Sequence, residues 1–496
     1  MAGIGVKLNR IFEKKSVFAN LVGFTYSTVA TVAPMILVIS AIVLMGWVLG
    51  LNRSEYLARE VFFCTVLYIF IFALLTASPF NAVLSKYMSD AIFEERYQDI
   101  LPCYYLGLVM NMTLSCLLGI PFCLWEHFIG GVEVFYVFTG FCAYISLALV
   151  FYSMIYLSIC KDYQRISVYF LIGMVEAFIL SLILHFLFGW EITISMLFAL
   201  MTGFFLIAVL EFTTVKRYFM ENSSRYLPVL RYFGKWWQLV AANFFYILGL
   251  YIHNFVFWTT DMRIVVVKSF VCNQPYDMAT CLAMFTNISA TVIFIARVEM
   301  YFHEKYKAYS EAVIGGKGAD IENTKKRMFR QLAGELMNLV RIQFIISVVV
   351  YLLCIIFLPQ FGFAGMVMRI YPCLAVGYFI LFLMYSAILF LYYFNDLAGA
   401  VMTSVGFCGI TFLGSVFATR LPEIWFGIGL VLGTFAGWSI AYMRLRWVER
   451  NLDTHVFCRG TLLEWGNGKE PTGVVYVKAA EGVEDAMASA KMAKGR

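Results

Sequence analysis

Long apolar runs separated by short polar segments fill the sequence from residue 18 to residue 443. About 20 apolar residues, wound as a helix, span the hydrocarbon core of a bilayer. We therefore predict an all-α polytopic membrane protein with about twelve transmembrane helices. The predicted spans lie roughly at 18–50, 57–84, 101–125, 133–160, 165–189, 192–214, 236–258, 278–298, 342–358, 371–394, 396–419 and 422–443.

Two details of the pattern affect the number and shape of the spans. The tenth and eleventh runs nearly touch, so an even number requires a break at Asn395–Asp396. Pro34 lies near the middle of the first run, where a proline removes a backbone hydrogen bond and kinks the helix. The bend is either a simple kink or a hinge that lines a cavity. The first run is too long for a cleavable signal peptide.

The composition excludes most soluble proteins. Of 496 residues, 62% are hydrophobic and 14% are charged, whereas soluble domains carry about 25% charged residues. A cytosolic enzyme, a nucleic-acid-binding domain and a disordered scaffold are therefore excluded. With the N-terminus placed in the cytoplasm, all but six of the 37 Lys and Arg residues fall in cytoplasmic segments. This positive-inside asymmetry predicts that both termini are cytoplasmic.

The longest predicted cytoplasmic segments, 215–235 and 299–341, suggest the organisation of the chain. The first lies near the middle and separates six spans from six, as in transporters built from two repeats. We predict an N-terminal six-helix lobe at 1–220, a C-terminal six-helix lobe at 221–450 and a cytoplasmic tail at 451–496. Aromatic residues at helical spacing mark 299–341 as an amphipathic segment that docks on neighbouring helices or on the membrane face.

Glycine and cysteine positions favour packing roles. The last span carries a glycine at every fourth position, which lets two helix backbones approach closely: Gly429, Gly433 and Gly437. The twelve cysteines are scattered, without a C-x-x-C or a zinc-binding spacing. Cys272 and Cys281 lie on or near the small outer loop at 259–277, where they either form a disulfide or fill apolar space.

The sequence holds no catalytic, nucleotide-binding or metal-binding motif, so we predict a protein that is not an enzyme and needs no cofactor. Ionisable residues within spans are the first functional candidates, because a charge in hydrocarbon is costly. Glu176, near the middle of the fifth span, is either a coupling carboxylate, a ligand for a polar substrate, or a hydrogen-bonded structural residue. Glu211 ranks low, because near an inner boundary it can extend toward water.

The remaining candidates are weaker. His185 lies close to the outer end of the fifth span, and His253 lies toward the outer end of the seventh. Polar residues within spans either line a path or join helices by hydrogen bonds. The candidates for a substrate path or coupling are thus Glu176, Asn243, Asn287, His185 and Pro34.

Four short stretches resemble a known family. The chain opens with MAGIG, and SDAIFEERYQDILP follows the second span from Ser89. The pattern E-x-x-F-x-x-x-Y-x-x-Y begins at Glu299, and YYFND ends the tenth span at Asp396. In this order, over roughly residues 1–450, the chain resembles the PelG family of exopolysaccharide transporters. That family belongs to the MOP superfamily, with MATE drug exporters and Wzx flippases. Departures occur at Val6, Ala33–Pro34 and Leu397.

The resemblance implies two six-helix lobes around a cavity that opens alternately to each side. It implies passage of Pel polysaccharide, rich in N-acetylgalactosamine, across the bacterial cytoplasmic membrane. The implied partners are a PelF-like glycosyltransferase and PelD-like and PelE-like membrane proteins. The cytoplasmic signatures then form a gate or a docking surface, or only hold helix ends together: Asp90, Glu94, Arg96, Glu299, Phe302, Tyr306 and Tyr309.

Three other functions remain open from the sequence. An ion-coupled exporter of small molecules or lipid-linked oligosaccharides would have the same fold. A membrane-embedded glycan enzyme would need a large outer loop with catalytic polar residues, and the loop at 259–277 is small. A scaffold for a synthase complex would move no glycan by itself.

Overall fold

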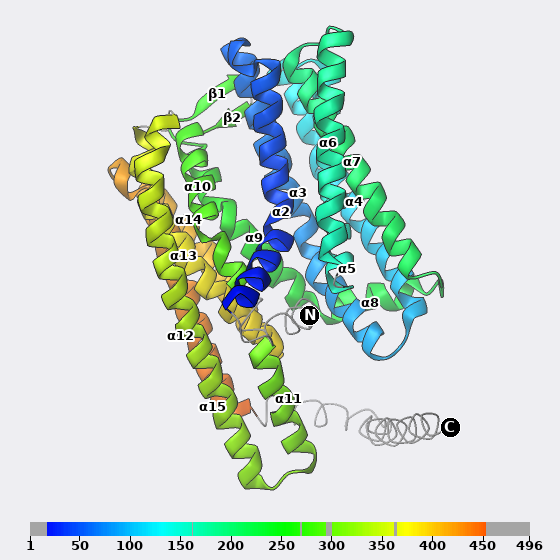
Figure 1. Cartoon of the computed structure of the whole chain (residues 1–496), viewed down its shortest axis with the longest axis vertical. Helices are drawn as coiled ribbons and strands as arrows, with labels where there is room; N and C mark the ends of the chain where they lie inside the picture. Colours follow the sequence, from blue (N-terminus) through cyan, green and yellow to red (C-terminus); the bar gives the residue numbers. More distant parts are fainter. Residues whose placement is uncertain (1–16, 161, 268–269, 294–299, 362–364, 453–496) are drawn as a thin grey trace.

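The computed structural model describes residues 17–160, 162–267, 270–293, 300–361 and 365–452. Within them the chain forms long helices that run side by side along the vertical axis of Figure 1, with one two-stranded hairpin. The helices are α2 (Val17–Leu49), α3 (Tyr56–Phe93), α4 (Ile100–Trp125), α5 (Val134–Ile159), α6 (Tyr163–Leu182), α7 (Ile192–Tyr218), α8 (Tyr226–Lys235), α9 (Trp237–Phe257), α10 (Gln274–Ile293), α11 (Met300–Gly315), α12 (Gly318–Phe357), α13 (Met366–Tyr393), α14 (Leu397–Ala418) and α15 (Ile428–Leu452). The strands are β1 (Ile264–Val267) and β2 (Phe270–Cys272).

The predicted membrane-spanning pattern is confirmed. Among the described residues, ten helices are long and apolar enough to cross a membrane. The other two predicted spans correspond to α2, which is apolar over Ala33–Leu49, and to α10. Predicted span eight continues past Ile293 into residues outside the described part of the chain. The break at Asn395–Asp396 is also confirmed, since α13 ends at Tyr393 and α14 begins at Leu397.

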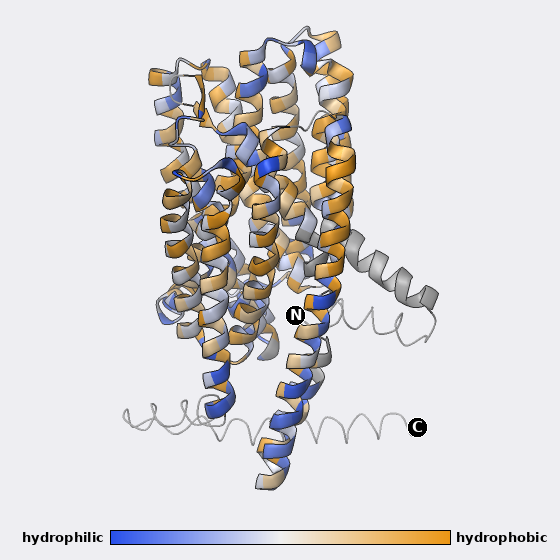
Figure 2. Cartoon of the chain, turned by 90° about the vertical axis from the view of Figure 1, so that its left-hand side faces the viewer, coloured by the Kyte–Doolittle hydropathy of each residue, from blue (hydrophilic) through white to orange (hydrophobic). Residues whose placement is uncertain are grey.

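Helix α12 is longer than the predicted span at 342–358. It is continuous from Gly318 to Phe357, which corresponds to about 60 Å at 1.5 Å per residue. A bilayer core is only about 30 Å thick, so about half of α12 extends beyond it. Figure 2 shows the change along the helix, with an orange upper part and a bluer lower part. No helix-breaking residue separates the two parts, and the hydropathy window detected only the apolar one.

The hairpin β1–β2 was not predicted, because 259–277 was taken as a loop. Its strands are antiparallel, with Ile264 opposite Cys272 and Val265 opposite Val271. The run of β-branched residues in β1 favours a strand and was the available signal. We call the end of the bundle that carries β1 and β2 the hairpin end, and the opposite end, where α8 lies, the linker end (Figure 1).

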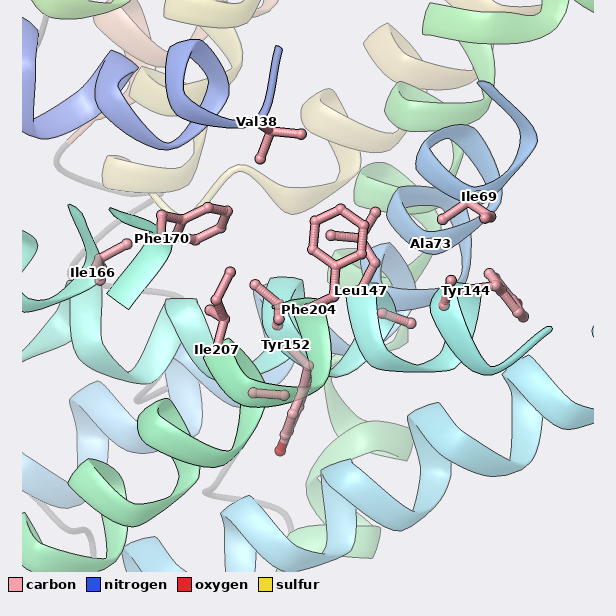
Figure 3. Close-up of a cluster of buried hydrophobic side chains, with 14 of the residues drawn as sticks. Val38, Ile69, Ala73, Tyr144, Leu147, Tyr152, Ile166, Phe170, Phe204 and Ile207 are labelled. Atoms are coloured by element: carbon pink, nitrogen blue, oxygen red, sulfur yellow. The ribbon is translucent and has the colours of Figure 1, made fainter. Parts of the chain in front are cut away.

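Two large buried clusters form the interior. One gathers side chains from α2 to α8, and Figure 3 shows part of it, with Phe204 and Leu147 between α5 and α7. The other gathers side chains from α9 to α15 and one residue of α3, Ile71. In lipid such packing is stabilised by close contact rather than by the exclusion of water. The grouping fits two six-helix lobes, and the exact boundary at residues 220 and 221 stays a prediction.

The glycine stripe in the last span is confirmed as a packing surface. Gly429, Gly433 and Gly437 are all buried on α15. A Cβ atom added at Gly433 would lie 2.8 Å from the backbone nitrogen of Thr411 on α14. Only glycine permits this approach, so the stripe fixes α15 against α14.

Candidate functional site

The loop between α3 and α4 is organised around Arg96. Its Nε donates to Glu94 Oε2 at 2.6 Å, and its Nη1 donates to Asp99 Oδ2 at 2.9 Å. These two carboxylates raise the pKa of Arg96 against the opposing effect of partial burial. Asp99 is only 4% exposed, whereas Glu94 is exposed. Arg96 therefore holds a buried carboxylate and a surface carboxylate in one loop.

The last turns of α3 and the same loop bind the segment that connects α7 to α9. Tyr232 on α8 donates to Asp90 Oδ2 at 2.5 Å, and burial together with this carboxylate raises the pKa of Tyr232. Ser223 donates through Oγ to Asp99 Oδ1 at 2.5 Å. Lys86 lies 3.5 Å from Asp90. Asp90 and Arg96 thus belong to two sets of contacts that hold the connecting segment against the ends of α3 and α4.

The aromatic pattern in α11 docks on a neighbouring helix. Phe302 is 2% exposed, and its ring centroid lies 4.9 Å from that of Phe390, near the end of α13, and 5.7 Å from that of Phe394, directly after it. Tyr309 is fully buried, and Tyr306 lies beside Phe302. This contact favours helix docking over membrane docking for these residues. Glu299 lies outside the described residues.

The tenth span ends in a charge pair that the sequence did not predict. Asp396 begins α14 and accepts from the Gly399 backbone nitrogen at 3.2 Å. Arg444 on α15 donates to both Asp396 oxygens, at 2.9 and 2.7 Å. Asp162 caps α6 in the same way, after α5 and before Arg165, and accepts from Tyr218 on α7. An aspartate that caps the next helix and pairs with an arginine therefore occurs twice in the described part of the chain, before α6 in the first half and before α14 in the second.

Replacing Asp396 with alanine is expected to destabilise the fold by about 3 kcal/mol, because it strands a partly buried guanidinium and removes a helix cap. The matched Asp162→Ala variant should lose only about 1 kcal/mol, since its partner Arg165 is 44% exposed. Denaturant unfolding of the purified protein in detergent measures both. Equal losses would contradict a special role for the Asp396–Arg444 pair.

Asn243 joins two groups of helices, the first bundle (α2 to α8) and the second bundle (α9 to α15). Its Nδ2 on α9 donates to the Ser78 carbonyl on α3 at 2.6 Å. The following residue, Pro79, lies inside α3 and deprives the Leu75 carbonyl of its usual backbone donor. The Ser78 hydroxyl replaces that donor at 2.9 Å. Asn243 therefore contacts α3 at a proline-weakened point, where a bend changes the fit between α3 and α9.

Glu211 is more deeply buried than Glu176, the residue predicted to couple transport to an ion. Glu176 lies on α6 and is half-buried, and its Oε2 has no hydrogen-bond partner among the described residues. Glu211 on α7 is fully buried, and neither of its carboxyl oxygens has such a partner in that part of the chain. Glu211 also interacts electrostatically with Tyr104 on α4. The sequence ranked Glu211 low, because its position along the chain did not show which way the helix turns it.

A network of hydroxyl groups lies beside Glu211. Tyr104 and Ser153 are 2.7 Å apart, and Tyr152 and Tyr156 are 3.0 Å apart, each measured between side-chain oxygens. Tyr152 also donates to the Tyr104 carbonyl at 2.8 Å. These groups join α4 and α5 and are buried. Of these groups, Tyr104 interacts electrostatically with Glu211, and none is hydrogen-bonded to its carboxyl oxygens.

The other predicted polar residues differ in their surroundings. His185 lies in a π-helical turn after α6, where Nδ1 is 2.9 Å from the Trp190 carbonyl, so its contact closes the helix end. Pro34 lies inside α2, as predicted. Asn287 lies in α10, and its side chain is outside the described part of the chain. Their functional roles stay predictions.

A buried polar cluster lies at the hairpin end of the second bundle. His253 Nδ1 is 2.8 Å from the Tyr276 hydroxyl, and His253 Nε2 has no partner among the described residues. Asp277 accepts from Asn254 at 2.7 Å and from the Trp258 indole at 3.0 Å. Sequence reasoning named His253 alone, because the other groups come together only when α9 and α10 pack. Among the described residues, no group of three or more His, Cys, Asp or Glu could hold a metal ion.

The hairpin packs against α3. Tyr68 donates to the Val271 carbonyl at 2.5 Å and stacks on Phe270 with ring centroids 4.9 Å apart. Cys64 and Cys272 are buried within the same small core. Cys272 and Cys281, the pair considered from the sequence, are free thiols. The hairpin thus connects the second half of the chain to the first at this end.

An aromatic cavity lies beside this contact. Its volume is about 260 Å³, and it opens between α3, α4 and α5 with Phe270 of the hairpin at its wall. The other rings that line it are Tyr68, Phe72, Phe122, Tyr136, Phe141 and Tyr144. Buried Glu126 also contributes to the lining. Such a lining suits an apolar or aromatic group better than a fully hydrated sugar.

One family model matches almost the whole chain. The family model described as PelG, exopolysaccharide exporter (EPS-E), covers residues 1–457. The chain belongs to the PelG family. No curated protein is significantly similar to it. The resemblance read from MAGIG and the cytoplasmic signatures is therefore confirmed.

Solved structures show the fold that PelG family membership implies. An outward-facing multidrug resistance MATE transporter of the MOP superfamily aligns with a TM-score of 0.59 at 13% identity, over 86% of this chain and 96% of its own. The MATE transporter VcmN of Vibrio cholerae, in its bent form, aligns with a TM-score of 0.59 at 12% identity, over 91% and 99%. A MOP superfamily transporter from Pyrococcus furiosus aligns with a TM-score of 0.57 at 14% identity, over 86% and 96%. This PelG family member therefore has the MOP transporter fold.

Proposed function

We propose that the protein carries a Pel-type exopolysaccharide, rich in N-acetylgalactosamine, across the bacterial cytoplasmic membrane together with a PelF-like glycosyltransferase. The observation that carries the proposal is the family match over residues 1–457. The MOP fold supports it, since that fold is a transporter fold. Both termini lie in the cytoplasm, as the positive-inside asymmetry predicts.

Alternating access would use the two contacts between the halves. At the hairpin end, Tyr68 and Cys64 on α3 hold the hairpin. At the linker end, α3 packs with α9 and α14 through a small cluster that includes Val83, Leu239 and Leu397. The Asn243–Ser78 bond lies between these contacts. Transport requires one end to open while the other stays closed, and Pro79 lets α3 bend between them.

The surfaces at the linker end would bind the partners. The α3–α4 loop presents Glu94 beside Arg96, and the α11–α12 helical pair extends beyond the bilayer. A PelF-like glycosyltransferase and PelD-like and PelE-like membrane proteins are the expected partners, from family membership. The glycosyltransferase would deliver the growing chain at this end, so loop geometry and export are coupled.

Replacing Arg96 with alanine is expected to lower polymer export several-fold while the protein still reaches the membrane. The change leaves Asp99 buried with Ser223 as its remaining side-chain partner, and an unsatisfied buried group costs about 1–3 kcal/mol. Extracellular polysaccharide and membrane-fraction protein are measured together. Glu299→Ala should have the same effect. The exposed Arg420→Ala variant, at the hairpin end, serves as the control. Normal export by Arg96→Ala and Glu299→Ala would remove these segments from the mechanism.

An ion-coupled small-molecule or lipid-linked oligosaccharide exporter is the second candidate. The aromatic cavity of about 260 Å³ favours it, because a cavity of that size and lining fits a small apolar ligand. Deleting the gene separates the two functions. Loss of extracellular polysaccharide with unchanged drug susceptibility supports the proposal, and drug sensitivity with normal polysaccharide supports the second candidate.

A further inference from the structure

The segment between α7 and α9 carries a concentrated positive charge. Five basic side chains between residues 216 and 235 are exposed: Lys216, Arg217, Arg225, Arg231 and Lys235. None of them forms an ion pair in the described part of the chain. Glu221 is the only carboxylate of this segment. The segment is described throughout, so the excess of positive charge is a property of its surface.

Apolar side chains are exposed in the same segment. Met220 is 81% exposed, Leu227 58%, Leu230 50% and Trp237 59%. On helix α8, apolar and basic residues are exposed on the same outer face, because one other face packs on the bundle. Val229 is 1% exposed and faces the bundle, with Tyr232 and Phe233 packed near it. Leu227 and Leu230 therefore lie on the outer face of α8, and Arg231 is beside them.

The segment lies between two membrane-spanning helices, which places its exposed surface next to the bilayer. Helix α7 ends at Tyr218 and helix α9 begins at Trp237, and both helices cross the membrane. The connecting segment is therefore tied at both ends to the bilayer surface. Helix α8 packs on the ends of α3 and α4 (Figure 1). Exposed leucine and tryptophan beside lysine and arginine are typical of helices that lie in the membrane interface.

We propose that the segment 216–237 binds the anionic phospholipid headgroups of the surrounding leaflet. The basic side chains attract the phosphates, and Leu227, Leu230 and Trp237 insert among the acyl chains. Since Tyr232 and Ser223 join this segment to Asp90 and Asp99, bound lipid holds it under the first bundle. The segment also connects the two halves, so anionic lipid stabilises one arrangement of the halves over the other.

The test uses the purified full-length protein in mixed micelles. Native mass spectrometry compares retention of phosphatidylglycerol and phosphatidylcholine by the wild type and by the triple variant Lys216→Gln, Arg225→Gln and Arg231→Gln. Each basic residue near an anionic surface contributes about fivefold in affinity, so the triple variant should bind phosphatidylglycerol about 100-fold more weakly. Wild-type binding should also fall with added salt.

A matched control removes three exposed charges far from the membrane, by Lys326→Gln, Arg327→Gln and Arg330→Gln on the extended part of α12. It should bind lipid as the wild type does. If the triple variant does not fold, the single variant Arg231→Gln should show the fivefold loss alone.

Three outcomes would overturn the proposal. The first is unchanged preference for phosphatidylglycerol in the triple and single variants, and the second is an equal loss in the control. The third is unchanged lipid binding with loss of a co-purifying glycosyltransferase, which would assign the surface to an acidic protein. Lipid binding is measured without polysaccharide, so its failure leaves the proposed export function untouched.

Discussion

Oxidation of Cys64 and Cys272 to a disulfide is expected to stop polysaccharide export. Cys64 lies on α3 in the first half of the chain, and Cys272 lies on β2 in the second. Both are buried in one small core with Val266 and Phe270. Both are free thiols, so an oxidant tests whether they lie within the range that a disulfide needs. The bond would hold the hairpin end closed, and alternating access requires it to open.

Export is measured in cells or vesicles treated with copper phenanthroline and then with a reductant. The wild type should lose export on oxidation and regain it on reduction. Cys64→Ser should keep export under both conditions, which controls for oxidation of the other cysteines. Full export by a protein shown to be crosslinked would contradict opening at the hairpin end. Crosslinking between Cys272 and Cys281 would contradict the packing of β2 on α3.

Replacing Glu211 with glutamine is expected to reduce export to the level of a strain that lacks the gene. Glu211 is fully buried in α7, and neither carboxyl oxygen has a hydrogen-bond partner among the described residues. A charged group in this position is costly, and such groups mark proton or cation relays in transporters. Tyr104 interacts electrostatically with Glu211, and its hydroxyl lies 2.7 Å from that of Ser153. Glutamine keeps the size of the side chain and removes its ability to ionise.

Two further variants make this test specific. If the half-buried carboxylate on α6 couples protons, Glu176→Gln should abolish export. Comparing Glu176→Gln with Glu211→Gln therefore shows which carboxylate is needed. Glu133→Gln, at an exposed position where α5 begins, should keep export within about twofold. Unchanged export in both Glu176→Gln and Glu211→Gln would mean that synthesis of the polymer, rather than a proton, drives the chain across.

The spans were predictable because bilayer thickness sets their length. Twenty apolar residues give the same signal whichever neighbours they pack against. Details that depend on neighbours were not predictable. Glu211 and Glu176 look alike in the sequence, and only the packing of α7 against α5 and α6 buries one completely. The Asp396–Arg444 pair joins residues 48 positions apart, which no local pattern reveals.

Only those residues of the candidate site that can be recognised along the chain were predicted. Aromatic spacing along the chain identified Phe302, whereas Asp90 and Arg96 were identified through the family resemblance of their segment. Their partners Tyr232, Ser223 and Phe390 come from distant segments. The hairpin was missed, although the β-branched run in β1 is a local signal, because the surrounding loop is short and the membrane pattern dominates the sequence.

The most direct test of the account is export into sealed inverted membrane vesicles. Vesicles that contain the protein and its glycosyltransferase receive nucleotide-activated N-acetylgalactosamine on the outside, which corresponds to the cytoplasmic side. We expect polymer inside the vesicles, protected from an added glycoside hydrolase, and none inside when the protein is absent. Polymer that forms in equal amount but stays accessible to the hydrolase in both preparations would contradict export by this protein.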